Sequence, residues 1–159
     1  MQLLASEEYG LRCLLQVAGC ADESPVSIAG IAKSEGLSPE YTAKLMRMLR
    51  LGGIVESTRG AEGGYRLSRP AAQITVWSAL QALGGEFFSA DFCACHPGQR
   101  QHCVRTSNCS IRALWQTLQS GARETLQDTS LQDLLRDERS MSDWIDGAPQ
   151  DARKHGIGA

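Results

Sequence analysis

Apolar residues recur every three to four positions along three segments of the first 51 residues, a spacing typical of helices packed on a core. The first predicted helix covers residues 7–21. The second lies between Ser27, which can cap its start, and Gly36, which can end it. The third starts with a serine cap and a first-turn proline, Ser38 and Pro39, and stops at a glycine pair. The expected inward-facing positions are Leu11, Leu14, Leu15, Ala18, Ile28, Ile31, Ala32, Tyr41, Leu45, Met48 and Leu49.

A strand–turn–strand pattern follows these helices. Residues 54–57 and 65–67 are strand-like, and the turn between them, residues 59–64, contains three glycines. The pair Gly63 and Gly64 suits backbone that requires positive φ or that approaches a DNA phosphate closely. Two helices joined by a short turn and followed by a small hairpin form a winged helix-turn-helix, so we expect a mainly α fold with a small β wing.

The second half predicts further helices around one irregular segment. Thr75 can cap a helix that carries Val76, Leu80 and Leu83, whereas residues 86–109 show no periodicity and are expected to form a loop. The next predicted helix, residues 110–126, carries a longer apolar stripe than a small head can cover. We therefore expect this helix to pack on a second copy of the chain. Its stripe comprises Ile111, Leu114, Trp115, Leu118, Ala122 and Leu126.

The C-terminal residues predict one short helix and then a tail. Ser130 and Asp133 have the spacing of a capping box at the start of that helix. From about Ser140 the chain is polar and glycine-rich, so we expect a loose tail. The predicted parts are a winged helix-turn-helix DNA-binding domain (1–85), a cysteine-bearing loop (86–109), a dimerisation helix with a short terminal helix (110–138) and a flexible tail (139–159).

The charge balance excludes a uniformly basic nucleic-acid binder, because the 159 residues carry a net charge of −2. Residues 38–70, however, hold six Lys and Arg against three Glu, while acidic residues dominate beyond Gln116. This distribution is compatible with one DNA-facing surface, or with plain solvated helix faces. No run reaches the roughly 18 apolar residues that span a bilayer, and the start lacks a secretory signal. We expect a cytoplasmic protein without a membrane partner.

The third helix has the polar face that a recognition helix needs. Glu40, Lys44 and Arg47 lie opposite its apolar side, where basic groups can reach phosphates or guanine in the major groove. Arg59 at the wing tip can reach the minor groove or the backbone. The alternative is a small helical domain with a surface hairpin. The candidate DNA-contacting residues are Ser38, Glu40, Tyr41, Lys44, Arg47, Arg59, Gly63 and Gly64.

Four cysteines crowd into 17 residues: Cys93, Cys95, Cys103 and Cys109. Thiols in a reducing compartment indicate metal ligands rather than disulfides. The gaps of seven and five residues are wider than the tight pairs of structural zinc sites, and three thiolates leave a fourth position open on a labile iron–sulfur cluster. Zinc and thiol redox chemistry stay open as alternatives.

These features resemble a known family, the winged-helix iron–sulfur regulators that include IscR, NsrR and RirA. The resemblance covers about residues 1–137. Its motifs are Tyr9-Gly10-Leu11-Arg12, Leu37-Ser38-Pro39-Glu40-Tyr41, Gly53-Ile54-Val55, Ser57-Thr58-Arg59-Gly60, Gly63-Gly64-Tyr65-Arg66-Leu67, the three spaced cysteines and Ile111-Arg112-Ala113-Leu114-Trp115.

The resemblance implies a transcriptional regulator that binds double-stranded DNA at a near-palindromic operator as a homodimer. It also implies a cluster on Cys95, Cys103 and Cys109, in the 4Fe–4S form by preference and in the 2Fe–2S form as the alternative. Glu8 matches the position at which NsrR-like members supply an acidic ligand from the partner subunit. The cluster state would then control operator affinity in response to iron, nitric oxide or redox state, most simply as a repressor.

Two departures from the family pattern bear on coordination. IscR-like members place a histidine ligand where this chain has Arg112, which argues against coordination of that type. The seven- and five-residue gaps are closer to RirA. Cys93 could serve as an all-cysteine fourth ligand, but we interpret it as a spare thiol, because a ligand so close to Cys95 would strain the loop.

Three other classes remain as alternatives. The first is a winged-helix regulator that binds zinc or senses redox state through its thiols. The second is an electron-transfer iron–sulfur protein, which would not need a helix-turn-helix. An enzyme is the least expected, because His96 and His102 have no carboxylate pair or glycine-framed serine to work with.

Overall fold

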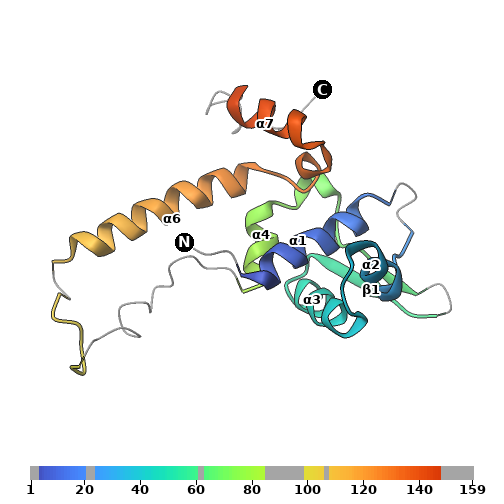
Figure 1. Cartoon of the computed structure of the whole chain (residues 1–159), viewed down its shortest axis with the longest axis horizontal. Helices are drawn as coiled ribbons and strands as arrows, with labels where there is room; N and C mark the ends of the chain where they lie inside the picture. The colour runs from blue at the N-terminus through green and yellow to red at the C-terminus, as the bar shows by residue number, and fades with distance from the viewer. Residues whose placement is uncertain (1–3, 21–23, 61–62, 85–98, 106–107, 148–159) are drawn as a thin grey trace.

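A head formed by the first helices and a hairpin carries one long helix that extends away from it (Figure 1). The computed structural model describes residues 4–20, 24–60, 63–84, 99–105 and 108–147. The elements of the head are α1 (Ala5–Ala18), α2 (Ile28–Glu35), α3 (Pro39–Leu51), β1 (Val55–Thr58), β2 (Gly64–Leu67), η1 (Ala71–Gln73) and α4 (Val76–Ala82). Beyond it lie α6 (Ser110–Asp128), η2 (Asp133–Leu135) and α7 (Glu138–Gly147). The mainly α fold with a small β wing is confirmed.

The helix-turn-helix is delimited by the local signals that the sequence contains. The Ser27 hydroxyl accepts a hydrogen bond from the Gly30 N–H at the start of α2, and Gly36 ends this helix with a φ of 66°. The Ser38 hydroxyl accepts a hydrogen bond from the Tyr41 N–H at 3.2 Å, with Pro39 in the first turn of α3. Each cap satisfies a backbone donor that has no partner within its helix.

Helix α1 is shifted toward the N-terminus relative to the predicted range of 7–21. Its first turn is closed by Glu7, whose carboxylate accepts a hydrogen bond from the Leu4 N–H at 2.7 Å. The Glu7 side chain is buried, and the helix ends at Ala18 before Gly19. The prediction missed this start because it took Glu7 as the first residue of the helix and not as a cap.

The core lies where α1, α2 and α3 meet the hairpin and α4. On α3 it takes up Leu45, Met46 and Leu49, while Tyr41 and Met48 are only half-buried. The predicted face, which included Met48, is therefore rotated toward Met46. The helix packs on α1 and on β1, so its buried side follows these two neighbours. The fully buried residues of greatest volume are Leu14, Ile31, Leu45, Met46, Leu49, Ile54, Ile74, Leu83 and Leu131.

The wing is an antiparallel hairpin in which Val55 pairs with Leu67 and Thr58 with Gly64. Each strand begins one residue away from its predicted start. Chain from before α2 extends this sheet, because the Val26 N–H donates to the Tyr65 carbonyl at 2.8 Å and the Tyr65 N–H donates to the Val26 carbonyl at 2.9 Å.

The two wing glycines have a structural role that the sequence did not indicate. A Cβ at Gly64 would lie 2.6 Å from the Val26 carbonyl oxygen, and one at Gly63 would lie 2.7 Å from that of Thr58. Among the described glycines, positive φ occurs at 36, 53, 60 and 84. The expectation of positive φ at Gly63 and Gly64 is therefore wrong. The structure shows a close approach of this pair to neighbouring backbone of the head, and a close approach to a DNA phosphate stays a prediction.

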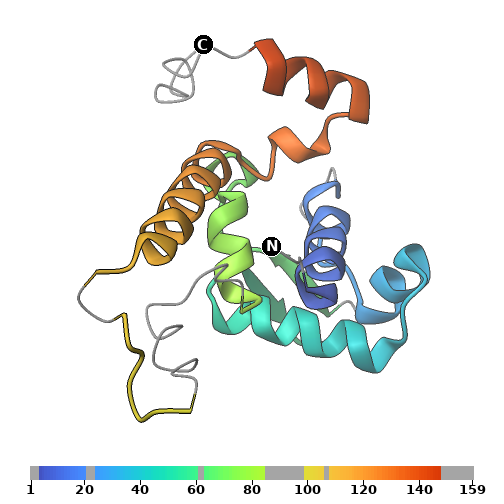
Figure 2. The ribbon, with the colours of Figure 1, turned by 60° about the vertical axis from the view of Figure 1, so that its left-hand side comes forward.

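The C-terminal end of α6 is joined to the head through backbone hydrogen bonds. The Val76 N–H donates to the Thr129 carbonyl at 2.9 Å, and the Leu131 N–H donates to the Ile74 carbonyl at 2.7 Å. Leu131 is 1% exposed, so the segment after α6 contributes to the core. The opposite end of α6 has no such anchor among the described residues and lies away from the head in both views (Figures 1 and 2).

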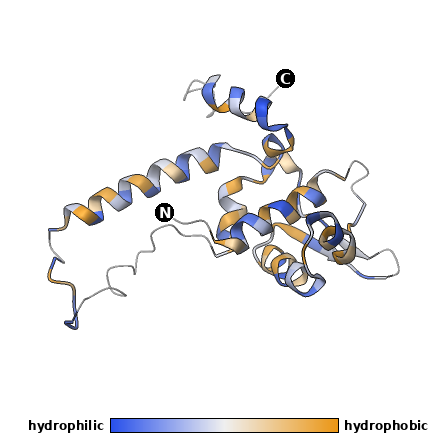
Figure 3. Ribbon diagram, viewed as in Figure 1, coloured by the Kyte–Doolittle hydropathy of each residue, from blue (hydrophilic) through white to orange (hydrophobic). Residues whose placement is uncertain are grey.

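Helix α6 carries an apolar stripe that stays uncovered by the described part of the chain. The helix has 19 residues, none of which is buried. Hydrophobic positions recur along its length (Figure 3). The most exposed members of the stripe are Ile111 at 54%, Leu114 at 55% and Leu118 at 50%. Among the described helices, none is both long and apolar enough to cross a membrane.

The predicted loose tail from about Ser140 is wrong for its first residues, which form α7. Asp137 caps this helix, since its carboxylate accepts hydrogen bonds from the Ser140 N–H and hydroxyl, both at 2.9 Å. Met141, Trp144 and Ile145 then share one face at helical spacing. Before α7, the predicted cap at Ser130 and Asp133 is confirmed, although the helix it begins is the short 3-10 turn η2.

Candidate functional site

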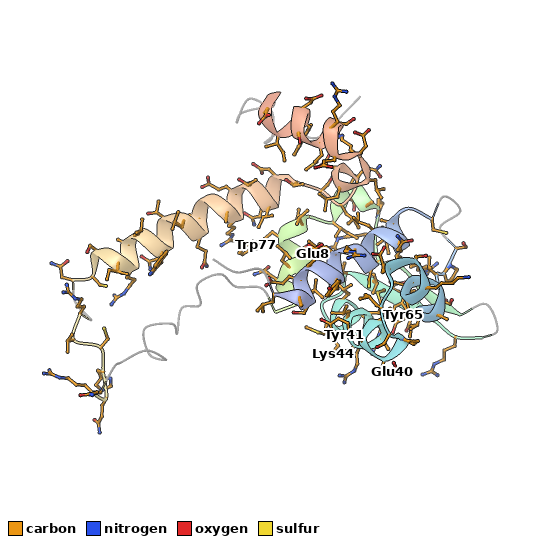
Figure 4. The ribbon with its side chains drawn as sticks, in the orientation of Figure 1. Glu8, Glu40, Tyr41, Lys44, Tyr65 and Trp77 are labelled. Carbon is orange, nitrogen blue, oxygen red and sulfur yellow. The ribbon has the colours of Figure 1, made fainter. Side chains whose placement is uncertain are left out.

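The solvent face of α3 carries the charges expected of a recognition helix. Glu40, Lys44 and Arg47 are all exposed, on the side opposite Leu45 and Leu49. Figure 4 shows Glu40 and Lys44 on the edge of the head that is remote from α7. A helix that presents these groups to solvent can enter a major groove without disturbing its own core.

Ser38 and Tyr41 are occupied within the head. The Ser38 hydroxyl is the cap of α3. The Tyr41 ring meets the Tyr9 ring of α1 edge to face, with centroids 6.1 Å apart and planes at 82°. Tyr41 is half-buried, so part of it remains available to a ligand. Both residues are placed to orient α3, and a DNA contact by either remains a prediction.

The wing contributes one exposed cation near its tip, Arg59. It precedes Gly60, whose φ of 119° turns the chain. Farther down the hairpin, Arg66 pairs with Glu56 of the opposite strand at 3.2 Å. Both members of that pair are about half exposed, so the pair contributes little to stability, but it partly neutralises Arg66. Arg59 is therefore the wing cation best placed for DNA.

An ion pair braces α1 against the end of α2. The Arg12 guanidinium donates to the Glu35 carboxylate at 2.7 Å and to the Glu35 carbonyl at 3.2 Å. The Gln16 amide donates to the other Glu35 oxygen at 2.6 Å. The hydrogen bond to the Glu35 carboxylate raises the pKa of Arg12. The same guanidinium lies 5.5 Å from the centroid of the Tyr9 ring, which connects the brace to the aromatic pair.

The cysteine segment is described in part. Cys93 and Cys95 lie outside the described residues. Cys103 and Cys109 are free, half-buried thiols. Within the described ranges no three His, Cys, Asp or Glu side chains form a group that could hold a metal ion. A site on these cysteines therefore needs donors from outside those ranges or from a second chain.

Cys109 has the geometry of a ligand that is held ready. It is the N-cap of α6, and its sulfur accepts a hydrogen bond from the Arg112 N–H at 3.4 Å. The hydrogen bond to the first turn of α6 fixes the position of this sulfur at the start of the helix. The position of Cys109 just before the helix was predicted, whereas the role of its sulfur as the cap was not.

Glu8 is exposed on the first turn of α1 and lies on the head (Figure 4). Cys109 directly precedes α6, a helix roughly 28 Å long at 1.5 Å per residue, whose other end joins the head. Glu8 and Cys109 of one chain are thus not brought together. Glu7, the neighbour of Glu8, is buried as a helix cap and is not available as a ligand.

The two remaining cysteines lie on or just after α1. Cys13 is fully buried in the core, and burial raises its pKa from 9.0 to about 11. Cys20 is half-buried, with its sulfur 3.2 Å from the Ser24 hydroxyl. Cys13 is therefore a core residue.

Comparison with known proteins gives a match over most of the chain. Residues 4–137 match the Rrf2 family, which is described as iron-dependent transcriptional regulators. The chain is 36% identical over 137 residues to the protein rrf2 of Nitratidesulfovibrio vulgaris, an alignment that covers 86% of this chain and 89% of that one. It is 34% identical over 141 residues to the HTH-type transcriptional regulator IscR of Vibrio atlanticus, covering 89% and 79%.

A solved structure gives the same overall architecture. CymR, the global cysteine regulator of B. subtilis, superposes with a TM-score of 0.69 at 28% identity and covers 85% of this chain and 96% of its own. Helix α7 begins at Glu138, directly after the last residue of the family match.

Proposed function

Because the chain belongs to the Rrf2 family of iron-dependent transcriptional regulators, we propose that an iron–sulfur cluster on Cys95, Cys103 and Cys109 controls its affinity for an operator. The protein is a DNA-binding transcriptional regulator with a winged helix, and not an enzyme. The cluster, its form and the operator belong to the proposal.

One observation carries the proposal furthest. Cys109 caps the end of α6 that is remote from the head, and the same helix bears the uncovered stripe of Ile111, Leu114 and Leu118. A second copy is the partner expected for a long apolar stripe on a chain of this size. The candidate metal ligand and the candidate dimer interface thus lie on one rigid element, so a change at one can reach the other.

The donor set fits an iron–sulfur cluster. Three thiols separated by seven and five residues can surround a group larger than one ion, and thiolate is the ligand that such clusters take. The fourth position is assigned to Glu8 of the partner subunit, since Glu8 is exposed and is remote from Cys109 within one chain. We assign Cys93 as a spare thiol. The 4Fe–4S form is favoured over 2Fe–2S.

When bound, the cluster supplies an inorganic centre that iron supply, nitric oxide or oxidants can alter. The protein's part is mechanical. Helix α6 joins the head at Thr129 and Leu131, so the angle of α6 to its partner fixes the spacing of two α3 helices. A half-site match requires that spacing to follow the helical repeat of DNA. A change in the loop at Cys109 alters the spacing of the two α3 helices. The protein, acting as a repressor, then releases its near-palindromic operator.

The test compares anaerobically purified protein before and after removal of iron by a chelator. We expect acid-labile sulfide, a visible absorption band and a change in operator affinity of about 5- to 150-fold between the two states, measured by gel shift. Cys103→Ser should abolish the band, whereas Cys20→Ser, outside the segment, should retain it. Equal affinity in both states, or protein without iron and sulfide, refutes the proposal.

A second candidate is a regulator that senses thiol state or binds zinc without a cluster. The similarity to a cysteine regulator, CymR, favours it, because that protein shares the architecture at 28% identity. The same preparation distinguishes the two functions. Colourless protein that carries zinc, or no metal, and that changes operator affinity on oxidation of Cys103 or Cys109 supports this second candidate.

A further inference from the structure

Arg112 closes the segment between two of the candidate ligands through two different groups. Its backbone N–H donates to the Cys109 sulfur at 3.4 Å, and its guanidinium donates to the Arg105 carbonyl at 3.2 Å. Arg105 is two residues after Cys103. One residue in the first turn of α6 therefore contacts the chain near both cysteines.

All charged side chains between Asp91 and Glu124, apart from histidine, are positive. No Asp or Glu occurs in the sequence between Asp91 and Glu124, although the chain as a whole is acidic. The same stretch contains four arginines: Arg100, Arg105, Arg112 and Arg123. Among the described residues of this stretch, Arg112 is the arginine whose backbone N–H and side chain both have hydrogen bonds to the cysteine segment. Thiolates that gather around iron carry net negative charge, so a fixed cation beside them stabilises the assembly.

We propose that Arg112 is a positioning residue that fixes the chain beside Cys103 to the first turn of α6, next to Cys109, before the cluster binds. The proposal rests on the proposed function and adds a residue to its site. Closing a loop costs conformational entropy, and a preformed hydrogen bond removes part of that cost from cluster assembly. The guanidinium also keeps a positive charge at the rim of the site.

The matched control is the neighbouring cation. Arg105 contributes its backbone carbonyl to the bond, so Arg105→Ala removes a positive charge from the same loop and keeps the acceptor. Arg112→Ala removes charge and donor together, in a helix that tolerates alanine well. Arg112→Lys keeps the charge but lacks the planar fork of the guanidinium. The three variants separate charge from hydrogen bonding.

The first readout is the rate at which anaerobic full-length protein loses iron to EDTA, measured by the decrease in visible absorption. We expect Arg112→Ala to lose iron about threefold to tenfold faster than wild type, the range of one ordinary hydrogen bond, because the bond to the Arg105 carbonyl is exposed to solvent. Arg112→Lys should be intermediate, and Arg105→Ala should stay within about twofold of wild type.

The second readout is the reduction potential, which a purely structural role would leave unchanged. Arg112→Ala should shift it to more negative values, because a cation near the cluster favours the reduced form, and Arg112→Lys should restore it. Equal iron loss and equal potential in Arg112→Ala and Arg105→Ala overturn the assignment of Arg112 alone. Wild-type protein that takes up no iron and sulfide overturns the proposed function, and the role of Arg112 with it.

Discussion

The Tyr9 ring on α1 meets the Tyr41 ring at the start of α3 edge to face, with their centroids 6.1 Å apart. The Arg12 guanidinium lies 5.5 Å from the Tyr9 centroid and is itself fixed to Glu35. The first turn of α3, the candidate recognition helix, is thus held by the helix that carries Glu8. Tyr41 therefore orients α3, whereas Lys44 and Arg47 of the same helix face solvent.

The first prediction concerns Tyr41. Tyr41→Ala should lower the free energy of unfolding by about 1–3 kcal/mol, because it removes an edge-to-face pair and a half-buried ring. Tyr41→Phe keeps the ring and its edge-to-face contact, so its free energy of unfolding should lie within about 0.5 kcal/mol of that of wild type. Urea unfolding measures the change. If Tyr41→Phe keeps full stability but loses operator affinity, the hydroxyl contacts DNA and the ring is not only a positioning group.

The second prediction concerns the wing. Gly64→Ala should destabilise the head by about 1–3 kcal/mol, because the new Cβ would lie 2.6 Å from the Val26 carbonyl oxygen and force the bridge apart. Gly147→Ala is the control outside the wing and outside the α6 stripe: its Cβ would meet nothing within 4 Å among the described residues, so the stability of the head should stay within about 0.5 kcal/mol of wild type. Thermal unfolding of both variants checks the pair. A Gly64→Ala protein as stable as wild type contradicts the structural role.

The third prediction concerns DNA contacts. Lys44→Ala should weaken operator binding and reduce the slope of log affinity against log salt by about one for each phosphate that the protein no longer neutralises. Arg47→Ala should weaken binding more strongly for one operator sequence than for another if it reads a base. Arg139→Ala removes an exposed cation from α7 and should leave both quantities unchanged. Fluorescence anisotropy at several salt concentrations measures them. A fall in affinity in Arg139→Ala equal to that in Lys44→Ala argues for a diffuse charge effect.

The fourth prediction concerns the oligomeric state. Leu118→Lys places a charge in the exposed stripe of α6 and should produce monomers at micromolar concentration, detected by sedimentation velocity. Gln116→Lys adds the same charge about 200° around the helix, at roughly 100° per residue, and should keep the dimer. A Leu118→Lys protein that sediments as wild type removes α6 from the interface. Operator affinity should fall together with dimer content, since each half-site needs one head.

The fifth prediction concerns pH. Burial raises the pKa of Cys13 from 9.0 to about 11, so the unfolded chain ionises first. The contribution of this thiol to stability is fully present below about pH 9 and is lost as the pH rises to about 11. The free energies of unfolding of wild type and Cys13→Ala should therefore converge over that window, since the comparison cancels the titration of other groups. A constant difference from about pH 8 to about pH 11 would contradict this prediction.

The helix boundaries were predictable to the extent that they depend on local hydrogen bonds. Ser27, Ser38 and Thr75 each cap the helix expected from the sequence, because a cap involves residues only three positions apart. Helix α7 had the same kind of signal in Asp137 and Ser140 and could have been found. The candidate DNA residues Lys44, Arg47 and Arg59 also followed from local pattern.

The sequence by itself determined the order of the α-helices and strands from α1 to α6, the polar face of α3 and the spacing of the cysteines, since periodicity and caps act within one or two helical turns. Only the tertiary structure decided that Tyr41 packs on Tyr9, that Gly64 accommodates Val26 and that Arg112 bonds near Cys103. The first two contacts join segments whose relative placement results from packing of the whole core, which residue spacing along the chain does not record. The third joins Arg105 to the first turn of α6 outside the core, in a stretch without a periodic pattern.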